Sequence, residues 1–129
     1  MTLDELNKME PRAADAMVAE RIMGFVRLAW ESDPQRYFLS LPEQAENYRM
    51  VVCDVPYFST DPAADYSVLC RVRQKWDIYD RQKFGIALDA IFQSRITYCM
   101  SAWETASMYE PGDYSRAALL AVSEQEVAE

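Results

Sequence analysis

The chain has 129 residues, of which half are hydrophobic and 12% aromatic, and its formal net charge is −8. This composition is unlike that of disordered chains and is sufficient for one hydrophobic core, so we predict a single domain over residues 1–129. The apolar runs are shorter than the ~20 residues of a membrane span, and the first residues lack a secretory pattern. Together with three widely spaced cysteines, which do not suggest a disulfide framework, these features predict a cytoplasmic protein without a membrane partner.

The acidic charge bears on the choice of partner. Phosphates would be repelled at long range, so we expect no direct nucleic-acid binding. Solubility explains the charge most simply because the acidic residues are scattered along the chain. Mimicry of nucleic-acid charge, which would place the protein in a basic groove of another protein, is the alternative.

The first 55 residues predict two helices and two strands. Alanine, methionine and glutamate favour a short helix over Leu3–Met9 and a firm one over Arg12–Met23, with Gly24 as a left-handed cap. Phe25–Trp30 has the pattern of a strand. Residues 31–47 then read as a loop excursion, with Tyr37–Leu41 extended, before a strand over Tyr48–Val55.

The clearest local signal is Asp61 followed by Pro62, which predicts a capped helix that continues to about Trp76. Phe84–Phe92 fits both period two and a helical spacing; we choose a strand, paired as a hairpin with Arg95–Trp103. Asp113 is then predicted to cap a last helix that ends at about Ser123, and the acidic tail 124–129 to fray.

These elements predict an α+β fold in which a mostly antiparallel sheet of about four strands packs with three helices as a helix–sheet–helix sandwich. A short sheet leaves unpaired edge strands, and many small proteins cover such edges by pairing with a second copy of the chain about a two-fold axis. We therefore also expect a homodimer.

Three blocks of sequence carry a family resemblance. They are AMVAERIMGF (16–25), YFSTDPAADYSVLCRVRQKW (57–76) and YEPGDYSRAALLAV (109–122). In their order and their helix-capping residues they resemble the phage ABA-sandwich domain family of small phage and prophage proteins. The resemblance implies a helix–sheet–helix fold and a phage origin, and it implies no active site.

The residue types argue against most catalytic chemistry. Histidine is absent, which excludes histidine-dependent nucleophiles and histidine-ligated metals. The cysteines form no C-x-x-C pair and there is no glycine-rich phosphate loop, so we predict no catalytic residue, cofactor or metal site. Asp61 and Asp65 lie one turn apart, and Asp15 lies near Glu20. We interpret these carboxylates as solvated helix faces rather than as catalytic or Mg²⁺-binding pairs.

Two surfaces are candidates for partner binding. The first combines acidic residues of the loop with two aromatic anchors, because loops on a rigid scaffold often carry function. Its residues are Glu31, Asp33, Tyr37, Phe38, Glu43 and Glu46. The second is a locally basic stretch with Arg71, Arg73, Lys75, Arg81 and Lys83. The alternatives are a tolerated insertion for the loop and helix-dipole compensation for the basic stretch.

The sequence thus predicts a non-enzymatic phage or prophage accessory protein that acts by binding a host protein or nucleoprotein complex, for example as an anti-CRISPR-like inhibitor of host defence. The alternative is a self-associating structural or regulatory phage component. An enzyme that uses carboxylates and a metal is the least favoured interpretation.

Overall fold

The structure, a computed structural model, describes residues 1–27, 36–39, 51–95 and 109–128. These residues form five helices and three short strands. In chain order they are α1 (Leu3–Lys8), α2 (Pro11–Arg21), β1 (Val26–Arg27), β2 (Arg36–Leu39), β3 (Val51–Asp54), α3 (Pro62–Lys75), α4 (Ile78–Gln93) and α6 (Asp113–Ala128).

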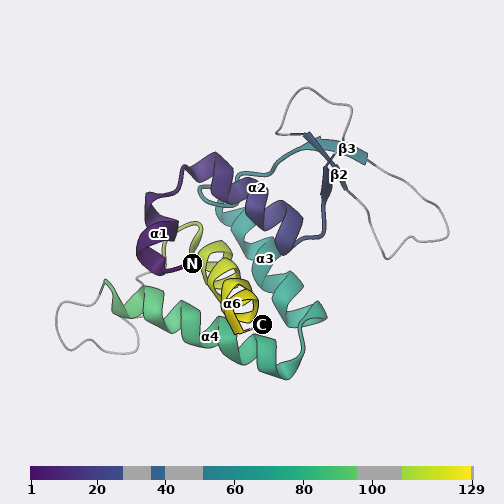
Figure 1. The fold of residues 1–129 in the computed structure, drawn as a ribbon. Coiled ribbons are helices and arrows are strands. Elements are labelled where there is room, and N and C mark those ends of the chain that lie inside the picture. The colour runs from purple at the N-terminus through teal and green to yellow at the C-terminus, as the bar shows by residue number, and fades with distance from the viewer. Residues whose placement is uncertain (28–35, 40–50, 96–108, 129) are drawn as a thin grey trace.

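Helix α6 lies at the centre of the molecule and contacts α1, α2, α3 and α4, which surround it in Figure 1. Its buried face consists largely of small side chains: Ala117, Ala118 and Ala121 are at most 2% exposed. Small residues let neighbouring helices approach the α6 backbone closely. The surrounding helices fill the core with larger apolar side chains, among them Val68 of α3 and Ile91 of α4.

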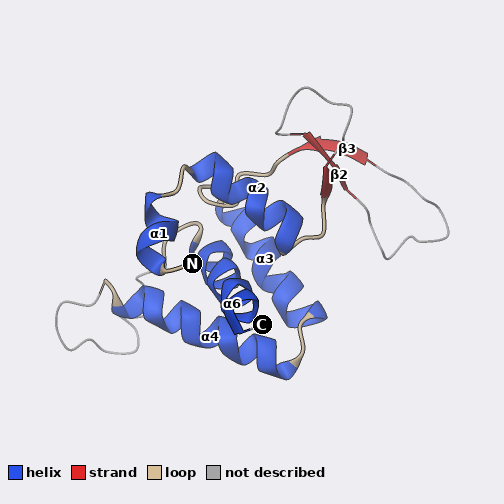
Figure 2. Cartoon of the chain, viewed as in Figure 1, coloured by secondary structure: helices blue, strands red, loops and turns tan. Residues whose placement is uncertain are grey.

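The strands form one antiparallel sheet in the order β1–β2–β3. Phe38 of the central strand is the register partner of both Val26 and Val52. Figure 2 shows this sheet at one side of the helical group and not between layers of helices.

The predicted α+β sandwich is therefore wrong. The described residues are mostly helical, and their core forms where helices pack on the central α6. A sandwich would need a sheet wide enough to separate two helical layers, whereas these strands have two, four and four residues.

The main error in the sequence-based fold is the strand over Phe84–Phe92, because this segment belongs to α4. Phe84 and Ile91, seven residues apart, are both buried, which is the spacing of one helix face. Ile86, which period two would have placed beside Phe84, is 70% exposed. The predicted partner strand, Arg95–Trp103, lies outside the described residues except for Arg95, which follows α4 in a turn.

Several local predictions are confirmed. Gly24 has φ of +75°, and the Asp61 side chain accepts a hydrogen bond from the Ala63 amide at 3.0 Å, directly before Pro62 in the first turn of α3. Strands β1 and β3 lie within segments predicted to be strands, and β2 overlaps the segment predicted to be extended but begins one residue earlier, at Arg36. Helix α6 continues to Ala128, beyond the predicted end at Ser123 and into the tail expected to fray. Among the described residues, no helix is long and apolar enough to cross a membrane.

Candidate functional site

Three aspartates are buried in the helical core: Asp15, Asp65 and Asp113 are each at most 1% exposed. Removing an ionised carboxylate from water is costly unless hydrogen bonds and opposite charges replace the lost hydration. The partners of these three groups therefore determine what they can do.

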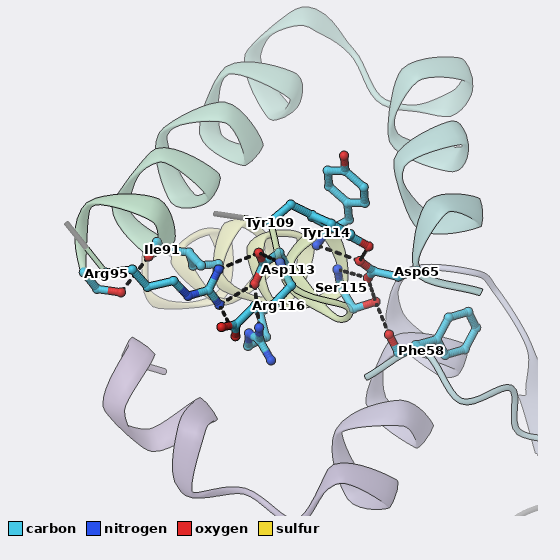
Figure 3. Close-up of polar contacts among 11 residues, drawn as sticks. Phe58, Asp65, Ile91, Arg95, Tyr109, Asp113, Tyr114, Ser115 and Arg116 are labelled. Atoms are coloured by element: carbon cyan, nitrogen blue, oxygen red, sulfur yellow. Dashed lines mark hydrogen bonds and ion pairs between the residues drawn. The ribbon is translucent and has the colours of Figure 1, made fainter. Parts of the chain in front are cut away.

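Asp65 accepts four hydrogen bonds from the segment that begins α6 (Figure 3). The Tyr109 hydroxyl donates to one carboxylate oxygen at 2.7 Å, and the Tyr114 amide donates to the same oxygen at 3.3 Å. The Ser115 amide and hydroxyl donate to the other oxygen at 2.9 and 2.6 Å. A carboxylate of α3 thus accepts from amides in the first turn of α6, in the manner of a cap supplied from a neighbouring helix.

Asp113, at the start of α6, binds two arginines. Arg95 donates two parallel hydrogen bonds to it at 2.7 and 2.6 Å, and Arg116 donates another. The Glu110 amide also donates to it at 2.8 Å. Burial by itself would raise the pKa of Asp113, but the hydrogen bonds from Arg95, Glu110 and Arg116 outweigh burial and lower it. Hydrogen bonding to Asp113 in turn raises the pKa of Arg95. This ion pair ties the end of α4 to the start of α6.

Asp15 joins α2 to the segment after β3. It accepts from Arg12 at 2.8 Å and from the Ser59 amide at 2.8 Å. Arg12 also donates to the Val55 carbonyl at 2.9 Å, and its guanidinium carbon lies 4.0 Å from the centre of the Tyr57 ring. This geometry is a cation–π contact.

The buried carboxylates therefore hold helices together. Burial and the hydrogen bond to Asp65 raise the pKa of Tyr109, and burial followed by the charges of Asp65 and Asp113 raises the pKa of Tyr114. Both shifts favour the protonated hydroxyls, and the Tyr109 hydroxyl is the donor to Asp65. In the part of the chain that the structure describes, no group of three histidine, cysteine or acidic residues could hold a metal ion.

The interpretation of Asp15 and Asp65 as solvated is wrong. Asp65 lies three residues before Val68 and seven before Val72, on the same helix face as these buried valines. An acidic residue on an apolar helical stripe signals a buried carboxylate, and this signal was present in the sequence. The prediction that Asp113 caps α6 is also corrected, because Asp113 accepts from Arg95, Arg116 and the Glu110 amide. The amides of Tyr114 and Ser115 in the first turn of α6 donate to Asp65 instead.

A second feature lies on the outer face of α4, opposite the core. Ile78, Tyr79 and Ile86 are 58%, 73% and 70% exposed. At 100° per residue these three side chains fall within one sector of the helix, away from the buried Phe84 and Ile91. Helix α4 is thus apolar on two opposite sides.

The basic residues predicted as the second binding surface are divided between α3 and α4. Arg73 and Lys75 are exposed near the end of α3, and Arg81 is exposed in the first half of α4. Arg71 and Lys83 are half-buried. A hollow of about 230 Å³ opens between α2, the end of α3, the first half of α4 and α6. It is lined by Arg21, Trp76, Asp80, Lys83, Ala121 and Val122.

Of the first predicted surface, the structure places Tyr37 and Phe38 on the central strand β2, where they pair with Cys53 and Val52. Glu31, Asp33, Glu43 and Glu46 lie outside the described residues. The grouping of these six residues into one surface stays a prediction. The exposure of Ile86 was missed because the segment from Phe84 was assigned to a strand.

Comparison with known proteins finds no match among family models, curated proteins or solved structures. The resemblance to the phage ABA-sandwich family therefore stays a prediction, and the sandwich that it implied is contradicted by the helical fold.

Proposed function

We propose that this protein acts by binding another protein, and that the corner between α3 and α4 is its binding surface. The observation that carries the proposal is the exposure of Ile78, Tyr79 and Ile86 on one side of α4. Clustered exposed apolar side chains are typical of interaction sites, and burying each large one against a partner contributes about 1.5–3 kcal/mol.

The charged residues of this corner indicate the chemistry of the partner. Arg73 and Lys75 near the end of α3 and Arg81 in α4 carry positive charge. Asp77, the N-cap of α4, and Asp89 of α4 are exposed and carry negative charge. Such a mixed surface favours a partner that presents both basic groups and carboxylates around an apolar contact, because complementary charges steer the encounter. Tyrosine and arginine are also the residue types that contribute most to binding at many interfaces.

The proposed role is non-catalytic. Its support is that Asp65 and Asp113, the most deeply buried carboxylates, accept hydrogen bonds from their own chain and stabilise the fold. Action in the cytoplasm of a bacterial host, as a phage or prophage accessory protein that inhibits a host complex, remains part of the proposal and rests on the sequence resemblance.

The test compares three tagged baits, each co-expressed with an untagged copy of the chain. They are the wild-type protein, the double variant Ile78→Asp/Ile86→Asp, and a control, Ala13→Asp, that introduces the same charge at an exposed position of α2. We expect a defined protein to be retained by wild type and control and lost from the double variant. Identical retained proteins in all three samples, by quantitative mass spectrometry, would refute the proposed surface.

A further inference from the structure

Helix α4 contains a glycine that contacts among the described residues do not explain. Gly85 lies in the middle of the helix and is exposed, and a Cβ added there would meet no described atom within 4 Å. Glycine in a helix interior costs about 1 kcal/mol relative to alanine. Its usual benefits are a positive φ or the close approach of another group. Gly85 is not among the described glycines with positive φ, so the close approach of a group outside the described residues is the remaining benefit.

The residues around Gly85 form two adjacent ridges at the i, i+4 spacing of helix surfaces. One ridge is Arg81, Gly85 and Asp89, and the other is Ile78, Gln82 and Ile86. Arg81, Gln82 and Asp89 are exposed, as Gly85 is. The first ridge therefore presents a positive charge, a gap and a negative charge at equal spacing.

This order is self-complementary. If a second α4 lies antiparallel to the first, with a two-fold axis near Gly85, the residue four positions before the axis meets the residue four positions after it. Arg81 then faces the partner's Asp89, and Asp89 faces the partner's Arg81. A parallel arrangement would instead place like charges together. Two-fold contacts are the commonest way in which identical chains associate.

We propose that the partner of this surface is a second copy of the chain, docked through an antiparallel contact between the two α4 helices that crosses at Gly85. The inference rests on the proposed function, because it names the occupant of the same surface. Ile78 and Ile86 would be covered by the second helix, and Gly85 lets the two backbones approach. This contact differs from the dimer through sheet edges that the sequence predicted.

The size of the contact sets its strength. Helix α4 has 16 residues and is therefore about 24 Å long. A single crossing of two such helices belongs with the small interfaces of less than about 1,200 Å² in total, which are weak and transient. The dimer is accordingly weak and forms in a concentration-dependent way.

The charge order provides a sharp test by sedimentation velocity over a wide range of protein concentration. Arg81→Asp and Asp89→Arg should each weaken self-association at least tenfold, because each places like charges opposite one another on both sides of the axis. The double variant Arg81→Asp/Asp89→Arg exchanges the two charges and should restore self-association to near the wild-type level. Lys8→Asp, an equal change of charge at an exposed position of α1, is the matched control and should have a much smaller effect.

Gly85→Leu gives an independent measurement. A Cβ added at Gly85 meets no described atom within 4 Å, so we expect the fold to persist by circular dichroism while self-association is lost. A wild-type chain that stays monomeric throughout, or a charge exchange that fails to restore association, overturns the inference. If the monomeric chain still retains a different protein through Ile78 and Ile86, the proposed function stands and the second copy as partner is wrong.

Discussion

Asp61, the N-cap of α3, and Asp65 lie one turn apart, but Asp61 is exposed and Asp65 is buried. The two residues are therefore a matched pair for measuring how much a buried carboxylate contributes to stability. Asp65→Ala removes the acceptor of four hydrogen bonds and leaves the Tyr109 and Ser115 hydroxyls without it. We expect a loss of about 3 kcal/mol or more in the free energy of unfolding by urea. Asp61→Ala removes an exposed cap and should cost about 0.5–2 kcal/mol. Equal losses would contradict the buried network.

The lowered pKa of Asp113 predicts how stability depends on pH. A carboxylate whose pKa is lower in the folded than in the unfolded state stabilises the fold above its unfolded pKa, and this contribution is lost as the pH falls through the folded value. Wild type should therefore exceed Asp113→Asn in free energy of unfolding by a constant amount above about pH 5, and the difference should shrink below about pH 4. Urea denaturation at several pH values measures it. A difference that does not change with pH would show that the ionisation of Asp113 does not contribute.

At the scale of elements, replacing each of two glycines by alanine should have opposite effects on the stability of the fold. Gly112, directly before α6, has φ of +96°, and an added Cβ would lie 2.7 Å from the Ser59 carbonyl oxygen, so Gly112→Ala should destabilise the fold by more than 1 kcal/mol. Gly85→Ala fills open space in a helix and should stabilise the monomer by about 1 kcal/mol. Thermal melting of dilute protein, where self-association is absent, compares the two. Destabilisation by Gly85→Ala would place that residue against another part of the same chain.

At the scale of the whole molecule, helix packing depends on α6, because its small side chains determine how closely four helices approach it. Ala118 is fully buried, so Ala118→Leu must displace neighbouring helices and should cost about 1–3 kcal/mol. Ala63→Leu, the same substitution at an exposed position of α3, should change stability by less than about 0.5 kcal/mol. Equal stability of the two variants would mean that α6 is not a packed centre.

The sequence by itself determined the features that depend on neighbouring residues. The cap at Asp61, the left-handed Gly24, the helices at the N-terminus and the positions of β1 and β3 all follow from local backbone preferences and hydrogen bonds to adjacent amides. The basic stretch from Arg71 to Lys83 is also visible in the sequence, because the distribution of charge along a chain does not depend on the fold.

Tertiary structure decided the rest. Phe84–Phe92 satisfies both periods, and its helical state is fixed by Phe84 and Ile91 packing in the helical core, which includes α6. Asp65 is 50 residues from Ser115, so no local pattern relates the two. The outer face of α4 became recognisable as apolar and exposed once the inner face was known. In each case the deciding interaction joins segments that are distant in the sequence, and burial of the shared surface outweighs local preference.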